Sequence, residues 1–256
     1  MDKKVKVSSV SYLNSKPFVY GLRKSDVKNR IELSLDMPSQ VALKLEHGQV
    51  DIGLVPVAAL LGNEKLEIVG SKCIGSHGKV RTVVLASQVP VEDIGTILMD
   101  YQSRTSVLLA RILSKFFWKK QIKWENTSSG FEKKLISGNT AAVVIGDRVF
   151  EIENKYTYIY DLSNEWGKFT GLPSVFAVWA ANKPLSQDIK AAFTGALDFG
   201  LANKKNVALE EKDFYPGVDI FAYLTDSIKF EMDDAMRESL ALFLEMAKKL
   251  EPVELT

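Results

Sequence analysis

Short apolar segments typical of strands alternate with helix-like segments along most of this 256-residue chain. The strand-like segments are residues 5–10, 31–35, 50–55, 66–69, 80–86, 96–100, 121–124, 141–145, 156–160 and 174–181. The run at 141–145 is apolar at every position, which is typical of a strand covered on both faces. The alternation predicts an α/β fold with largely parallel sheets.

Two breaks interrupt this alternation, one at residues 90–94 and one at the Gly-Leu-Pro of 171–173. A strong strand-like segment lies beside each break, which indicates two lobes joined by two hinge crossings. We expect lobe one to be discontinuous, with residues 1–88 and 176–256, and lobe two to hold residues 89–175. In such two-lobed proteins the ligand cleft lies between the lobes.

The charge balance and the few sulfur and imidazole side chains exclude several classes of protein. Lys and Arg total 33 against 32 Asp and Glu, so the net charge is +1 and no nucleic-acid partner is expected. One cysteine, Cys73, excludes an internal disulfide, and with only two histidines no metal site is expected. Cys73 is interpreted as a small buried apolar residue. No dinucleotide or phosphate-loop motif is present, and no cofactor is expected.

The hydropathy pattern gives no membrane-spanning segment, because no run of about 18 apolar residues occurs. The first residues alternate Lys with Val and show neither an apolar leader core nor a cleavage site. We therefore expect a cytoplasmic protein that does not contact a membrane.

Polar residues follow three of the apolar strands directly before expected helices, at 11–15, 103–106 and 146–147. Ligands of open α/β sheets bind at the carboxyl ends of strands, where helix N-termini offer free N–H groups to carboxylates or phosphates. The alternative is that these residues only cap helices, as Asn14 or Ser15 would do before Pro17. Convergence of several junctions in space would favour ligand binding.

Five motifs, in order along the chain, resemble the chorismate dehydratase family of the futalosine route to menaquinone (the MqnA type). They are residues 10–17 (VSYLNSKP), 48–57 (GQVDIGLVPV), 73–80 (CIGSHGKV), 103–106 (SRTS) and 170–179 (TGLPSVFAVW). The resemblance implies a two-lobed fold of the type II periplasmic-binding-protein kind. It also implies a hydro-lyase that needs no metal or organic cofactor and converts chorismate to 3-[(1-carboxyvinyl)oxy]benzoate.

The resemblance also implies roles for particular residues. Asn14 and Thr82 are the expected catalytic residues, although the family has serine where Thr82 stands. Residues with N–H or hydroxyl groups for the two substrate carboxylates are Ser11, Ser103, Thr105 and Ser106. Arg104 either clamps a carboxylate or points to solvent, whereas Asp147 is expected to act as a cap or hinge residue. His77 replaces the family's aspartate and is either without consequence or a pH-sensitive donor.

No acidic or imidazole side chain in the motifs is an obvious base. The resemblance therefore fits a substrate-assisted elimination, in which the enolpyruvyl carboxylate takes the C3 proton. Two other functions stay open. The same fold serves binding proteins for small carboxylates, and the sister dihydroxynaphthoate synthase shares it but has a different N-terminal signature. The expected partner is the dicarboxylate substrate, bound by a monomer or weak homodimer.

Overall fold

The computed structural model describes residues 4–251, which form two compact units. The first unit comprises residues up to Gly75 together with Val175–Asp233, and the second comprises Ser76–Ser174 and the chain from Asp234. The chain passes between the units at residues 75/76, 174/175 and 233/234. The third of these passages was not expected from the sequence.

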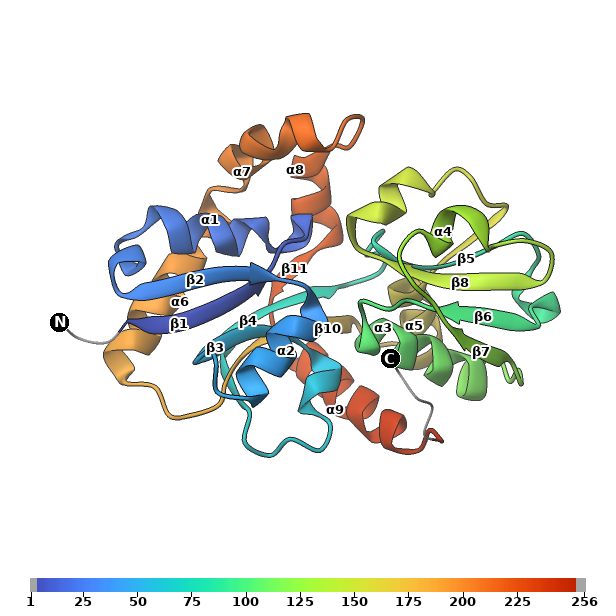
Figure 1. Ribbon diagram of the computed structural model, residues 1–256, viewed down its shortest axis with the longest axis horizontal. Coiled ribbons are helices and arrows are strands. Elements are labelled where there is room, and N and C mark those ends of the chain that lie inside the picture. Colours follow the sequence, from blue (N-terminus) through green and yellow to red (C-terminus); the bar gives the residue numbers. More distant parts are fainter. Residues whose placement is uncertain (1–3, 252–256) are drawn as a thin grey trace. The chain divides into compact units, whose positions relative to one another are not determined.

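The first unit is built on a six-stranded mixed sheet with strand order β11-β4-β10-β3-β1-β2 (Figure 1). Its strands are β1 (Val5–Val10), β2 (Ile31–Asp36), β3 (Ile52–Pro56), β4 (Glu67–Ser76), β10 (Ser174–Ala181) and β11 (Lys229–Glu231). Its helices are α1 (Lys16–Lys24), α2 (Pro38–Glu46), α6 (Gln187–Ala202), α7 (Lys204–Glu211) and α8 (Ile220–Ala222). Strand β1 is parallel to both β2 and β3, whereas β10 is antiparallel to β3.

Helices α1 and α2 cover opposite faces of this sheet (Figure 1). Because β2 and β3 flank β1 on opposite sides, right-handed crossovers require this placement. On the α1 side, Phe18 packs edge-on against Trp179, which packs edge-on against Phe193 of α6, with ring centroids 5.8 and 5.0 Å apart. These three side chains are almost fully buried and form the centre of the first core.

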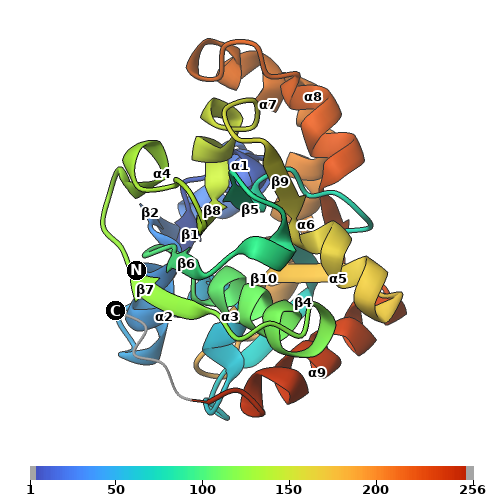
Figure 2. The same cartoon turned by 90° about the vertical axis from the view of Figure 1, so that its right-hand side faces the viewer.

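The second unit is built on a five-stranded mixed sheet with strand order β7-β6-β8-β5-β9. Its strands are β5 (Val83–Ser87), β6 (Thr96–Met99), β7 (Lys123–Asn126), β8 (Thr140–Ile145) and β9 (Tyr158–Asp161). Its helices are α3 (Arg104–Ile112), α4 (Phe131–Lys134), α5 (Leu162–Thr170) and α9 (Asp234–Lys248). Helix α4 lies on one face of the sheet, and α3 and α5 lie on the other (Figure 2).

The expected division of the chain differs from the observed one at two places. Residues 80–86 were expected in lobe one, but β5 lies between β8 and β9 of the second sheet. The C-terminal helix was also expected in lobe one, but α9 packs on α5: Ser239 accepts a hydrogen bond from the Trp166 indole N–H (2.9 Å) and donates to the Pro173 carbonyl. The sheets are also mixed and not largely parallel, because β4, β5, β9, β10 and β11 each have an antiparallel neighbour.

Within residues 4–251, no helix combines the length and apolar character that a membrane span requires. In the same range, no cluster of three or more His, Cys, Asp or Glu side chains is arranged to hold a metal ion.

Candidate functional site

The turn that follows β1 is held by Ser15. The Ser15 hydroxyl donates to the carbonyls of Val10 (2.6 Å) and Tyr12 (2.8 Å), and its backbone N–H donates to Tyr12 as well (3.0 Å). Ser15 occupies the N-cap position of α1, but its side chain makes no capping hydrogen bond, so the expected side-chain cap is wrong. The hydroxyl instead closes the loop and fixes the short 3-10 helix η1 (Leu13–Ser15) that carries Asn14.

Asn14 has a buried amide oxygen that lacks a hydrogen-bond donor within the described part of the chain. Leaving such a group unpaired costs about 1–3 kcal/mol, so a buried orphan calls for an explanation. An acceptor held on this turn at the carboxyl end of β1 could accept a hydrogen bond from a ligand. Ser11, at the start of the same turn, is exposed.

The neighbouring strand end in the first unit is occupied by a satisfied network. The Asp36 carboxylate, at the end of β2, accepts from Ser8 (2.7 Å), Ser34 (2.8 Å) and Lys44 (2.6 Å). Burial alone would raise the pKa of Asp36, but these hydrogen bonds outweigh burial and leave the pKa below its usual range. The network ties β1, β2 and α2 together and is a structural feature of this edge.

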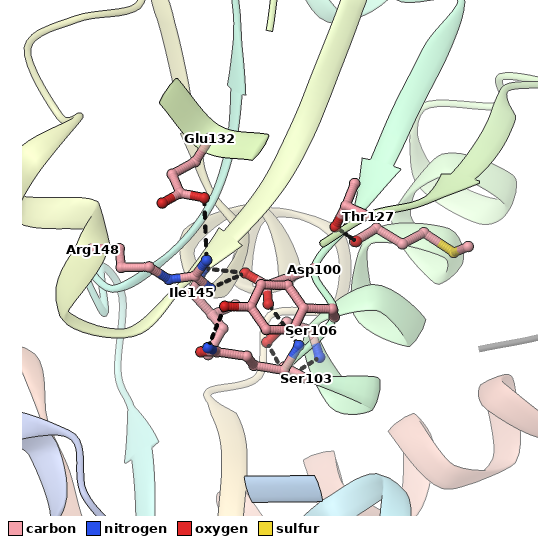
Figure 3. Close-up of polar contacts among 10 residues, drawn as sticks. Asp100, Ser103, Ser106, Thr127, Glu132, Ile145 and Arg148 are labelled. Carbon is pink, nitrogen blue, oxygen red and sulfur yellow. Dashed lines mark hydrogen bonds and ion pairs between the residues drawn. The ribbon is translucent and has the colours of Figure 1, made fainter. Parts of the chain in front are cut away.

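In the second unit, the carboxyl ends of β6, β7 and β8 meet at one edge because these strands are parallel. The first residues of β5 reach the same edge, since β5 is antiparallel to β8 with Val83 opposite Ile145. Figure 3 shows the polar contacts there, including the hydrogen bond from Thr127, after β7, to the carbonyl of Met99 (2.6 Å). Two of the polar junctions predicted from the sequence, 103–106 and 146–147, therefore converge in this unit.

Asp100 is the centre of this edge (Figure 3). Its carboxylate accepts hydrogen bonds from the backbone N–H groups of Gln102 (2.8 Å) and Ile145 (3.0 Å) and from the Arg148 guanidinium (2.6 Å). Burial raises the pKa of Asp100, against the opposing effect of Arg148. Arg148 also reaches Glu132 (3.3 Å) and lies over the rings of Tyr101 and Phe131.

The predicted substrate-binding residues at the start of α3 are placed differently from one another. Ser103 is the N-cap: its oxygen accepts from the Ser106 N–H (3.1 Å), and its hydroxyl donates to the Ser106 oxygen (2.9 Å). Thr105 is buried at 2% exposure. Arg104 is exposed, and its side chain makes no hydrogen bond or ion pair to another residue in 4–251.

Thr82 lies at the same edge, directly before β5. It is buried, its carbonyl accepts from the Gly146 N–H (2.9 Å), and its hydroxyl lies 3.5 Å from the Val80 carbonyl oxygen. Asp147 is in the first turn of the 3-10 helix η6 (Gly146–Glu151). The cap or hinge role expected of Asp147 stays a prediction.

Motif 73–80 contains two further residues of interest, Cys73 and His77. Cys73 is fully buried in β4, with its sulfur 3.9 Å from the Lys229 carbonyl, which confirms the interpretation of a small buried residue. His77 is exposed.

A model of the menaquinone (vitamin K2) biosynthesis family matches residues 5–249, which is nearly the whole chain. The chain belongs to the menaquinone biosynthesis family. This membership agrees with the resemblance carried by the five motifs, of which the N-terminal one holds Asn14 and the fourth holds Ser103–Ser106.

Solved structures similar to this member of the family have a periplasmic-binding-protein-like fold. Protein AF1704 from Archaeoglobus fulgidus superimposes with a TM-score of 0.76 at 15% identity, over 96% of this chain and 97% of that one. The Candida albicans CA3427 gene product, described as having the generic periplasmic binding protein fold, gives 0.64 at 14% identity, over 99% and 93%. The aliphatic sulphonate binding protein SsuA from Escherichia coli gives 0.60 at 15% identity, over 97% and 92%. At these identities the likeness concerns the fold, and it confirms the expected two-lobed α/β architecture.

The sequence analysis did not identify Asp100, Glu132 and Arg148. These three residues form the ion-pair and hydrogen-bond network at the edge of the second sheet, in which Arg104 takes no part. A signal was present for Asp100, because it is the first charged residue after a buried strand. No comparable signal marks Glu132, whose burial depends on the pairing with Arg148.

Proposed function

We propose that this member of the menaquinone biosynthesis family is a chorismate dehydratase. The reaction breaks the C4–O bond of chorismate and the C3–H bond, releases water and forms the aromatic ring of 3-[(1-carboxyvinyl)oxy]benzoate. Aromatisation supplies the driving force, so the protein's task is to bind and orient the substrate and to assist proton movement.

The observation that carries the proposal is the buried, donor-free amide oxygen of Asn14, within the motif that resembles the dehydratase signature. The C4 hydroxyl of chorismate is a donor that can satisfy this oxygen, while the amide NH2 remains able to donate. Asn14 would thereby hold the leaving group along the direction of departure. The C3 proton goes to the enolpyruvyl carboxylate of the substrate, which returns it to the departing hydroxide as water.

Hydroxyl and N–H groups of the second unit are assigned to the same substrate. Thr82 keeps the hydroxyl expected at its position, although a β-branched side chain has fewer rotamers than serine. The N-terminus of α3, with Thr105 and Ser106, presents the positive end of the helix dipole to a carboxylate, and the Ser106 hydroxyl, which accepts from Ser103, keeps its own proton for donation. Ser11 and Ser103 stay in the proposal as binding residues. The Ser103 hydroxyl donates to Ser106 and its N–H to the Asp100 carbonyl (3.5 Å), so Ser103 would exchange one of these partners for the substrate. The exposed Arg104 side chain has no partner within residues 4–251, so it is available to clamp a carboxylate.

The experiment is direct. Purified protein is incubated with chorismate and no added cofactor, and the product is followed by liquid chromatography and mass spectrometry. We expect 3-[(1-carboxyvinyl)oxy]benzoate to accumulate in proportion to enzyme. No product at micromolar enzyme would overturn the proposal.

The alternative of a binding protein for small carboxylates is supported by the fold alone. A thermal-shift panel of chorismate, later intermediates of the route and amino acids separates the two functions. Stabilisation by chorismate together with turnover supports the dehydratase, whereas stabilisation by a ligand that is released unchanged supports a binding protein.

A further inference from the structure

The turn that leads into β5 has an uncommon backbone conformation. Arg81 has a φ of 66°, in the left-handed region that non-glycine residues rarely enter. Such a residue persists only where surrounding contacts hold it, and these residues cluster at functional sites. Arg81 directly precedes Thr82.

The contact that holds this turn comes from Asp161, at the end of β9. One carboxylate oxygen accepts from the Arg81 N–H at 2.7 Å. The other accepts from the N–H groups of Ser163 and Asn164, each at 3.1 Å, and caps α5. The side chain of Asp161 is buried, and these hydrogen bonds all come from backbone groups. The carboxylate therefore joins the helix N-terminus to the strained turn.

The Arg81 side chain contributes less. Its guanidinium lies 3.3 Å from Glu153 and over the ring of Phe150. This ion pair is about one third exposed on both sides, and pairs of this kind contribute little to stability. The backbone bond to Asp161 is therefore the main restraint on the conformation at residue 81.

Thr82 is held from both directions. The turn at Arg81 fixes its N-terminal side, and the hydrogen bond from Gly146 fixes its carbonyl. Strand pairing sets Val84 opposite Asp161, so the carboxylate and the turn lie at the same end of β5.

We propose that Asp161 is a positioning residue for Thr82: through the Arg81 N–H it maintains the left-handed turn that orients the Thr82 hydroxyl. The inference rests on the proposed function for its catalytic consequence. A cap for α5 needs only one oxygen, and the second oxygen is given to a group outside the helix. The capping and positioning roles can therefore be separated by substitution.

The test uses Asp161→Ser, because serine is also a good N-cap but is too short to hold both partners. Asp161→Asn is the second variant; its NH2 group would face the Arg81 N–H, donor against donor. Glu153→Gln is the matched control, since it weakens only the side-chain contact of Arg81. Thr82→Val, alone and combined with Asp161→Ser, completes a double-mutant cycle. Steady-state kinetics with chorismate and amide hydrogen exchange at Arg81 and Thr82 are measured for each protein.

We expect Asp161→Ser to lower kcat by about tenfold or more with a smaller change in KM, because misplacement of a reacting group acts mainly on the chemical step. Exchange at Arg81 should accelerate by about the same factor, since its acceptor is lost. In the Thr82→Val background the same substitution should change kcat by less than about twofold, because the residue it positions is gone. Glu153→Gln should resemble the wild type in both measurements.

Independent effects of Asp161→Ser and Thr82→Val on kcat would overturn the proposal, as would unchanged exchange at Arg81. Wild-type kcat in Thr82→Val would refute the role of Thr82 and with it the positioning role. If the wild-type protein does not turn over chorismate, the proposed function fails, and the exchange measurement still decides whether Asp161 holds the turn.

Discussion

The Arg148 guanidinium lies 2.6 Å from the carboxylate of Asp100, whose side chain is completely buried. Because that carboxylate also accepts the Ile145 N–H, the pair joins the end of β6 to the end of β8. Glu132 extends the network from α4. The buried carboxylate of Asp100, at the centre of this polar edge, is therefore stabilised by the Arg148 cation beside it.

Replacing Arg148 by Met should destabilise the second unit strongly. The substitution leaves Asp100 buried without its cation, which costs about 3–5 kcal/mol when one partner of a buried pair is removed. Urea unfolding measures the loss. Lys133→Met is the control, because the Lys133–Glu151 pair in the same unit is exposed and its loss should change little. Equal effects of the two substitutions would contradict the assigned importance of the Asp100–Arg148 pair.

Asn14→Ala should separate activity from stability. Removing a buried acceptor that has no donor should leave the free energy of unfolding unchanged or slightly increased. Removing the residue that positions the leaving group should lower kcat by about 100-fold, the size of effect that a misplaced reacting group produces. Chorismate turnover and urea unfolding are measured together.

Asn182→Ala is the control for Asn14→Ala, because it removes an asparagine whose hydrogen bonds are made within the protein. The Asn182 amide donates to the carbonyls of Leu45 (2.6 Å) and Val50 (3.0 Å), so its removal should lower stability and leave kcat nearly unchanged. Wild-type turnover by Asn14→Ala would rule out its catalytic role.

The sequence predicted the elements better than their assignment to sheets. A run such as Val83–Ser87 is apolar on both faces, and this pattern is the same whichever sheet the strand joins. The boundary of the first lobe was therefore placed after residue 88, although the chain enters the second unit at Ser76. Only the pairing of this strand with β8 and β9, which lie far from it in the sequence, shows that it belongs to the second sheet.

Candidate site residues were found where a motif or a strand-to-helix junction marked them, as for Asn14 and Ser103. Capping was one of the two roles considered for residues 103–106, and Ser103 does cap α3. Asp161 was missed because α5 itself was not predicted, although an Asp N-cap and Gly171 at the C-cap frame it. The left-handed turn at Arg81 has no sequence signal, since it depends on a carboxylate 80 residues away.

Gly21→Ala should destabilise the first unit by packing alone. A Cβ at Gly21 would lie 1.9 Å from the Ala196 carbonyl oxygen, and one at Gly200 would lie 1.9 Å from that of Pro17. Helices α1 and α6 would have to separate, which costs on the order of 3 kcal/mol or more. Gly195→Ala is the control on α6: nothing lies within 4 Å of the added Cβ, so it should gain about 0.5–1 kcal/mol of helix stability. Thermal unfolding of the two variants and the wild type checks this, and a stable Gly21→Ala protein would contradict the close helix contact.

Asp36→Asn should change how the stability of the first unit depends on pH. Hydrogen bonds from Lys44, Ser8 and Ser34 outweigh burial and hold the folded-state pKa of Asp36 below its usual value. The unfolded chain therefore binds a proton at higher pH than the folded chain does. The stabilisation is fully present above the unfolded value, about pH 4, and is lost as the pH falls through the lower folded value. Urea unfolding of both proteins between pH 7 and pH 3 should show wild type more stable at neutral pH and the difference shrinking below about pH 4. A difference that stays constant over the whole range would show that the network stabilises the fold without the Asp36 charge.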